Sequence, residues 1–154
     1  MNIIRGDLIA LAKDNYFDVI VHGCNCFNSM GAGIAVTIKN EFPEAYEADL
    51  QTVKGDRNKL GTISHAEIDR DGIKLIVVNA YTQYRYNGKG VLADYKAIAL
   101  CMKAIKLNFS GKSIGYPKIG AGLAKGDWQT IAKIIDRELA GENHTLVEYV
   151  RSQI

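Results

Sequence analysis

The feature that most constrains the fold is an alternation of strand-like and helix-like segments, broken by one short hairpin. The sequence Asp69-Arg70-Asp71-Gly72 predicts that hairpin, because glycine readily supplies the positive φ of a tight turn. The strands on either side of it should therefore be antiparallel. Short segments rich in β-branched residues and flanked by turn residues predict six strands in all, over Ile3–Arg5, Val19–His22, Leu60–Ile68, Ile73–Ala80, Ser113–Tyr116 and Thr145–Val150.

Apolar residues at helical spacing fill the intervals between most of these strands. Strands that alternate with helices, with one hairpin added, predict a three-layer α/β/α fold with a mixed, mostly parallel central sheet. A length of 154 residues suits one domain, which we expect to span 1–154. The predicted helices are Leu8–Ala12, a segment containing Ile34, Ile38 and Phe42 that Pro43 interrupts or restarts, Asp94–Leu107, and a last helix that Asp127 caps and Gly141 ends.

Composition excludes several classes of protein. Hydrophobic residues make up 47% and charged residues 23% of the chain, which is typical of a globular domain and not of a disordered one. A formal charge of only +2 gives no electrostatic footprint for duplex nucleic acid or an anionic membrane. No run approaches the ~18 apolar residues of a membrane span, and the N-terminus lacks the layout of a signal peptide. We therefore expect a cytoplasmic protein without a membrane partner and, since its apolar surface residues look scattered, a monomer.

The three cysteines do not predict a metal site. Cys24 and Cys26 form a C-x-C pair instead of the C-x-x-C of zinc and redox sites, and Cys101 stands alone in a helical pattern. No Cys or His pair elsewhere completes a tetrahedral zinc site. Small buried thiols are the expected state, and neither a metal nor a cofactor is predicted.

Two glycine-rich segments have the same layout of a strand, a run of small residues and the start of a helix. The first follows the strand that ends at His22, and the second follows the strand that ends at Tyr116. Neither is a dinucleotide fingerprint, since Val36 occupies the place of the third glycine in the first segment. One such turn alone is weak evidence of a ligand, because simple turn chemistry explains it equally well. Two at the carboxyl edge of the same sheet predict that backbone amides grip a diphosphate from both sides.

His22 and Asp7 are the titratable groups that could serve this site. His22 closes an apolar strand and should point toward the first glycine segment, where an imidazole is either a base or nucleophile or a structural residue. Asp7 follows the first strand, and it either caps the short helix after it or accepts a hydrogen bond from the exocyclic amine of a base. The residues alone do not choose between these roles.

An aromatic and basic cluster follows the fourth predicted strand. Interleaved aromatic and basic side chains can stack nucleobases, but this cluster is short. A mobile loop beside a pocket is the expected reading of Tyr81, Tyr84, Arg85 and Tyr86.

Taken together, these segments resemble a macrodomain, the α/β/α module that binds ADP-ribose. The resemblance runs from Asn2 to about Tyr149, and no single motif carries it. Four motifs in the family's order do: Arg5-Gly6-Asp7-Leu8, His22-Gly23-Cys24-Asn25-Cys26, Gly31-Ala32-Gly33-Ile34-Ala35 and Ile119-Gly120-Ala121-Gly122-Leu123.

The chain is most similar to the branch with the ADP-ribose 1″-phosphate phosphatases and the terminal ADP-ribose glycohydrolases. This resemblance implies that Asp7 bonds the adenine amine, with the Leu8 amide on the ring. It implies that Asn25 orients the distal ribose and that His22 is catalytic at the distal phosphate. It also implies that the ribose and the diphosphate are bound by Gly31, Ala32, Gly33, Ile34 and Ala35 of the first segment, and by Ile119, Gly120, Ala121, Gly122, Leu123 and Ala124 of the second.

One departure from that branch bears on the reaction. Its glycohydrolases carry a catalytic lysine and an aspartate where this chain has Gln83 and Ala124. Asp127 follows three residues later, either as a substitute acid or, as we expect, as a helix cap. The leading expectation is therefore a phosphatase that acts on ADP-ribose 1″-phosphate. The alternatives are a hydrolase that removes single ADP-ribose units from protein or nucleic acid, and a non-catalytic ADP-ribose reader.

Overall fold

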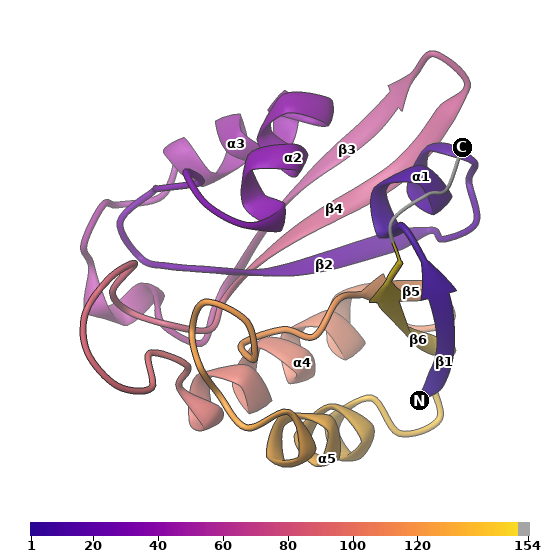
Figure 1. Ribbon diagram of the computed structural model, residues 1–154. Coiled ribbons are helices and arrows are strands. Elements are labelled where there is room, and N and C mark those ends of the chain that lie inside the picture. The colour runs from indigo at the N-terminus through magenta and orange to yellow at the C-terminus, as the bar shows by residue number, and fades with distance from the viewer. Residues whose placement is uncertain (151–154) are drawn as a thin grey trace.

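A computed structural model of the chain describes residues 1–150 and has one six-stranded sheet with helices on both faces (Figure 1). This is the predicted α/β/α architecture. The strands are β1 (Asn2–Gly6), β2 (Val19–Cys24), β3 (Ile63–Arg70), β4 (Ile73–Tyr81), β5 (Ile114–Tyr116) and β6 (His144–Tyr149). The helices are α1 (Leu8–Lys13), α2 (Ile34–Glu41), α3 (Pro43–Leu50), α4 (Tyr95–Phe109) and α5 (Trp128–Glu138), with a short 3-10 helix over Arg57–Lys59.

The sheet is mixed and mostly parallel, as predicted. Its strand order is β1-β6-β5-β2-β4-β3, and only the β3–β4 pair is antiparallel. The predicted turn joins that pair, with Asp71 at φ 55° and Gly72 at φ 77°. All the parallel strands therefore end at the same edge of the sheet, which is the edge expected to hold a ligand.

Two apolar cores fix the layers. One core lies between the sheet and α4 and α5, and it contains fully buried Ile98, Ile105 and Ile131. The other lies between the opposite face and α1, α2 and α3, with Ile38 and Phe42 at its centre. Figure 1 shows α2 and α3 on one side of the sheet and α4 and α5 on the other.

Several segment boundaries differ from the prediction; the third strand, for example, is Ile63–Arg70 instead of Leu60–Ile68, and two further differences bear on the site. Pro43 starts a second helix instead of only ending the first, because its fixed φ suits the first helical position. Strand β2 continues to Cys24, since its last three residues pair with Asn79, Ala80 and Tyr81 of β4. In residues 1–150 no helix is both long and apolar enough to cross a membrane.

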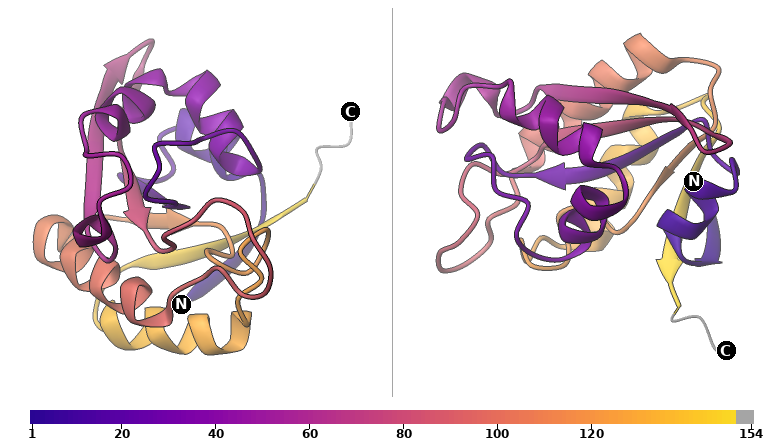
Figure 2. Two further views of the ribbon diagram at one scale, coloured as in Figure 1. Left: turned by 90° about the vertical axis from the view of Figure 1, so that its left-hand side faces the viewer. Right: turned by 90° about the horizontal axis from the view of Figure 1, so that it is seen from above.

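The connections that follow β2, β4 and β5 gather at one end of the sheet, opposite the β3–β4 hairpin (Figure 2). They are residues 25–33, 82–94 and 117–127. The first and last contain the two glycine segments, so the fold brings together segments that lie about ninety positions apart in the sequence.

Candidate functional site

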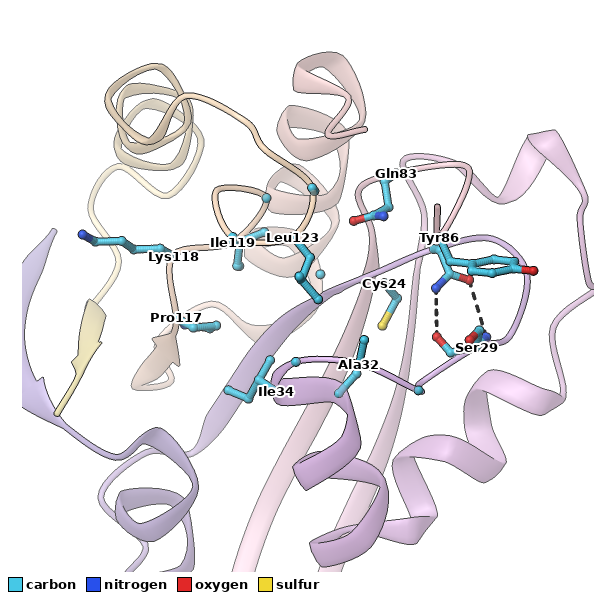
Figure 3. Close-up of a pocket in the computed structure, with 18 residues that line it drawn as sticks. Cys24, Ser29, Ala32, Ile34, Gln83, Tyr86, Pro117, Lys118, Ile119 and Leu123 are labelled. Carbon is cyan, nitrogen blue, oxygen red and sulfur yellow. Dashed lines mark hydrogen bonds between the residues drawn. The ribbon is translucent and has the colours of Figure 1, made fainter. Parts of the chain in front are cut away.

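A cavity of about 440 Å³ lies between the two glycine segments (Figure 3). The Leu123 side chain of the second loop reaches Gly33 of the first loop, since a Cβ built on Gly33 would lie 3.4 Å from Leu123 Cδ1. The two loops therefore face each other across the cavity. The cavity is lined by Gly23 and Cys24 at the end of β2, by Asn25, Ser29, Gly31, Ala32 and Gly33 of the first loop, by Ile34 and Ala35 at the start of α2, by Gln83 and Tyr86, and by Pro117, Lys118, Ile119, Gly120, Gly122, Leu123 and Ala124 of the second loop.

Most of the residues expected at the ligand therefore line this cavity. Those that do not are Ala121, Asp7, Leu8 and His22. Asp7 caps α1, where its Oδ1 accepts hydrogen bonds from the amides of Ile9 (2.9 Å) and Ala10 (3.2 Å). Leu8 is buried in the core beside it. The cap is thus one confirmed role of Asp7, and contact of Asp7 and Leu8 with an adenine ring stays a prediction.

The side chain of Asn25 holds the first loop in shape. Its Oδ1 accepts a hydrogen bond from the Phe27 amide (2.9 Å), and its Nδ2 donates to the Ser29 carbonyl (2.8 Å). Such a turn fixes the loop without help from a sheet. The second hydrogen of Nδ2 has no partner among residues 1–150, so this half-buried amide retains one donor for a ligand oxygen.

The first loop ends in a helix start that has no side-chain cap. Gly33 precedes α2 with φ 62° and ψ −148°, a conformation that is essentially restricted to glycine. No side chain bonds to the first turn of α2, so its leading amides remain available. Amides at a helix N-terminus attract anions, and these border the cavity.

The second loop is closed by a tight backbone contact. The Gly126 amide donates to the Gly120 carbonyl (2.7 Å), and a Cβ on Gly126 would lie only 2.5 Å from that oxygen. Asp127 then caps α5, where its Oδ2 accepts hydrogen bonds from the Thr130 amide (3.1 Å) and hydroxyl (2.6 Å). Asp127 is therefore the helix cap that the sequence predicts, and it does not line the cavity.

A buried polar network supports the first loop from below. The Lys59 ammonium donates to Asn28 Oδ1 and lies 4.8 Å from the centre of the Tyr81 ring. The Tyr81 hydroxyl donates to the carboxylate of buried Asp49 (2.7 Å), and Thr52 Oγ1 donates to Asn28 Oδ1 (3.3 Å). Burial raises the pKa of Asp49. The Asn28 side chain is held by Lys59 of the 3-10 helix and by Thr52, which follows α3.

The expectation that His22 points toward the first loop is wrong. Because β2 continues for two further residues, His22 lies inside the sheet, fully buried and away from the cavity lining. Its Nε2 lies 2.7 Å from Asn79 Oδ1, and burial lowers its pKa to about 4. The imidazole is therefore neutral near pH 7. It reaches the site only through Cys24, whose Sγ lies 3.5 Å from the ring.

The cavity suits an anionic ligand. Its lining contains no aspartate, glutamate or histidine. The Cys24 thiol projects into it, but burial raises the pKa of this group well above its usual value and keeps it protonated. The Lys118 side chain extends away from the centre (Figure 3). The polar groups that line the cavity are thus backbone amides and the neutral side chains of Asn25, Ser29, Gln83 and Tyr86. Within residues 1–150 no three metal-ligating side chains gather.

Sequence reasoning did not place Cys24 in the lining, because this residue was expected to be only a buried thiol. Tyr86 was expected in a loop beside a pocket, and it does line the cavity. Gln83 also lines the cavity, and its Nε2 donates to the Arg85 carbonyl (2.8 Å). This neutral amide occupies the position at which the glycohydrolases were expected to carry a lysine.

The chain has relatives among known proteins. It is 40% identical over 140 residues to an uncharacterized 17.5 kDa protein of Enterobacteria phage T4, covering 86% of each chain. It is 28% identical to ADP-ribose glycohydrolase OARD1 of Bos taurus, over 86% of this chain and 80% of that one. It is 27% identical to ADP-ribose 1″-phosphate phosphatase of Candida albicans, over 82% and 85%.

A solved structure supports the same fold. Thermosipho africanus DarTG, in complex with ADP-ribose, matches 99% of this chain and 42% of its own with a TM-score of 0.75, at 18% identity. The family model described as Macro domain matches residues 21–135, which include both glycine loops. The chain therefore belongs to the Macro domain family.

Proposed function

We propose that the chain binds ADP-ribose in the 440 Å³ cavity and removes the terminal phosphate of ADP-ribose 1″-phosphate. The observation that carries this proposal is the pair of facing loops, which offer backbone amides and no carboxylate to a ligand. A diphosphate needs this arrangement, because neutral amides bind its charge without repulsion. The Candida albicans relative is an ADP-ribose 1″-phosphate phosphatase, and the Thermosipho africanus structure contains ADP-ribose. Both support the same ligand for this chain.

The reaction requires little acid–base chemistry from the protein. Water forms a new P–O bond while the bond between the terminal phosphorus and the ribose oxygen breaks, which yields ADP-ribose and inorganic phosphate. Such transfers depend mainly on positioning and on stabilising charge. The oxygens of the phosphate itself can accept a proton of the attacking water and pass it to the departing ribose oxygen, which becomes the hydroxyl of ADP-ribose. A lining with no histidine and no carboxylate is compatible with this chemistry.

Two tasks remain for the protein, orienting the distal ribose and binding the phosphates, and Asn25 and the first turn of α2 can perform them. The free hydrogen of Asn25 Nδ2 would orient the distal ribose, and the amides of Ile34 and Ala35 would bind the phosphates. His22 would position Cys24 and the end of β2 from beneath and would not touch the reacting atoms.

Phosphorus NMR of ADP-ribose 1″-phosphate with and without the purified protein tests this function. A growing signal of inorganic phosphate, together with shifted diphosphate signals, is the expected result. Shifted signals without released phosphate would replace the phosphatase with a non-catalytic reader. Unchanged spectra would contradict binding itself.

A hydrolase that releases ADP-ribose from a modified macromolecule is the second candidate. The likeness to ADP-ribose glycohydrolase OARD1 favours it, and so does a second cavity beside the first. The neutral side chains of Gln83 and Ala124 weigh against it, since neither forms a lysyl adduct nor supplies an acid. Release of free ADP-ribose from a modified glutamate or a modified nucleotide would establish this activity.

A further inference from the structure

Residues 52–59 lie between α3 and β3 and include the short 3-10 helix; we call them the outer segment. None of them lines the first cavity. The outer segment is nevertheless bonded to two of the three connections that surround this cavity, namely the first loop (residues 25–33) and the connection after β4 (residues 82–94). Its contacts can therefore affect the ligand site only through these two connections.

The outer segment holds Asn28 of the first loop through three hydrogen bonds. Asn28 Nδ2 donates to the Thr52 carbonyl (3.2 Å), and Asn28 Oδ1 accepts from Thr52 Oγ1 (3.3 Å) and from the Lys59 ammonium. Asn28 has a φ of 57°, a left-handed conformation that asparagine tolerates better than most residues. The next residue, Ser29, lines the cavity and accepts a hydrogen bond from Asn25. The conformation of Asn28 therefore sets the path by which the loop reaches the cavity.

A second set of contacts joins the outer segment to both connections at once. The Gly55 amide donates to the Cys26 carbonyl (2.7 Å), and the Gly55 carbonyl accepts from the Tyr84 hydroxyl (2.7 Å). The Tyr84 carbonyl in turn accepts from the Cys26 amide (2.9 Å). The Arg57 guanidinium lies 4.1 Å from the centre of the Tyr84 ring. The outer segment thus holds the first loop against the connection after β4.

Lys59 is an unusual residue for this position, because its side chain is only 7% exposed. Its ammonium donates to Asn28 Oδ1 and to the Val53 carbonyl (3.4 Å), and it faces the Tyr81 ring. The Tyr81 hydroxyl donates to the carboxylate of buried Asp49, so two opposite buried charges contact the same tyrosine. Burying charges costs free energy, and apolar residues of similar size often stabilise a fold at least as well. Stability alone therefore does not account for Lys59.

We infer that Lys59 is a positioning residue, which acts through Asn28 to hold the first loop in the shape that binds ADP-ribose. This rests on the ADP-ribose binding of the proposed function and holds whichever bond the site cleaves. Without the bond from Lys59, the loop spends only part of its time in the binding shape, and the apparent affinity falls by that fraction. A role in the stability of the whole fold is the alternative. It predicts that any equally destabilised variant binds equally weakly.

Calorimetric titration with ADP-ribose, together with thermal unfolding of the same proteins, tests the inference. Lys59→Met keeps an unbranched side chain beside Tyr81 but removes the bond to Asn28, and it should weaken ADP-ribose binding roughly tenfold. Because this variant leaves Asp49 as a buried charge on its own, the double variant Lys59→Met with Asp49→Asn is measured as well. The double variant should unfold at a higher temperature than Lys59→Met and show the same loss of affinity.

Two further measurements separate positioning from general stability. Ile68→Ala opens a hole in the core at the hairpin end of β3, far from the site, and should lower the unfolding temperature while keeping the affinity within about twofold of the wild type. Asn28→Ala, alone and combined with Lys59→Met, completes a double-mutant cycle. If Lys59 acts through Asn28, the combined variant should bind ADP-ribose within about twofold of Asn28→Ala alone.

Three outcomes would overturn the inference: wild-type affinity in Lys59→Met with Asp49→Asn, losses from Lys59→Met and Asn28→Ala that add in full, or the same loss of affinity in Ile68→Ala. Failure of the wild type to bind ADP-ribose is a separate result. It would overturn the proposed function and, with it, the inference.

Discussion

At the scale of single residues, His22 is a candidate catalyst by its sequence context but a buried residue in the folded chain. Its ring is fully buried beside Asn79, and burial lowers its pKa from the ordinary 6.5 to about 4. Between these two values the unfolded chain binds a proton that the folded chain does not bind. Acidification from pH 6.5 toward pH 4 should therefore lower the free energy of unfolding, by roughly 3 kcal/mol in total.

Denaturant unfolding of the wild type and His22→Gln at pH 7 and pH 4.5 measures this contribution. Glutamine does not titrate, so the variant should lose less stability than the wild type over the same interval. Equal losses in the two proteins would show that His22 does not carry the effect.

Cys24 offers a second residue-scale test, because its thiol alone among the three cysteines lines the first cavity. Alkylation of Cys24 by iodoacetamide should be slow, since burial raises the pKa of the thiol, and ADP-ribose should slow it severalfold further. Peptide mass spectrometry reads each cysteine separately. Cys26 and Cys101, both fully buried, serve as internal controls. A rate at Cys24 that does not respond to ADP-ribose would place the ligand elsewhere.

At the scale of elements, the second glycine loop depends on the close contact between Gly126 and the Gly120 carbonyl. A Cβ at Gly126 would meet that oxygen at 2.5 Å, so Gly126→Ala should lower the free energy of unfolding by about 1–3 kcal/mol and weaken ADP-ribose binding. Gly122→Ala is the matched control, since a Cβ there meets nothing within 4 Å, and its stability should change by less than about 0.5 kcal/mol. Thermal unfolding compares the two, and equal stability would contradict this account of the loop.

The elements were largely predictable from sequence, because local patterns determine them. Helical spacing, Pro43 and the turn at Asp71 and Gly72 correspond to observed helices, a helix start and a hairpin. The end of β2 was not predictable in this way. Its last two residues become strand because β4 pairs with them, and this partner lies more than fifty positions away. With that small extension, His22 lies two residues before the end of the strand, fully buried and outside the cavity lining.

At the scale of the whole molecule, strand order decides what the site can accommodate. The strand order sets Asp7, which follows β1, far along the sheet from the second cavity, which the connection after β4 helps to line. Sequence motifs identified the two loops but not the second cavity, because its lining comes from α2, α3 and three separate connections. A formal charge of +2 for the chain likewise does not reveal that Lys39, Lys54 and Arg85 line one cavity together.

Amide NMR during a titration with ADP-ribose tests the central claim most directly, since it reports every backbone amide of the two loops at once. The largest shifts should fall at residues 31–35 and 119–124, with smaller shifts near Asp7, and the β3–β4 hairpin should stay unchanged. Shifts confined to one loop, or largest away from both, would contradict a ligand held between the two glycine segments.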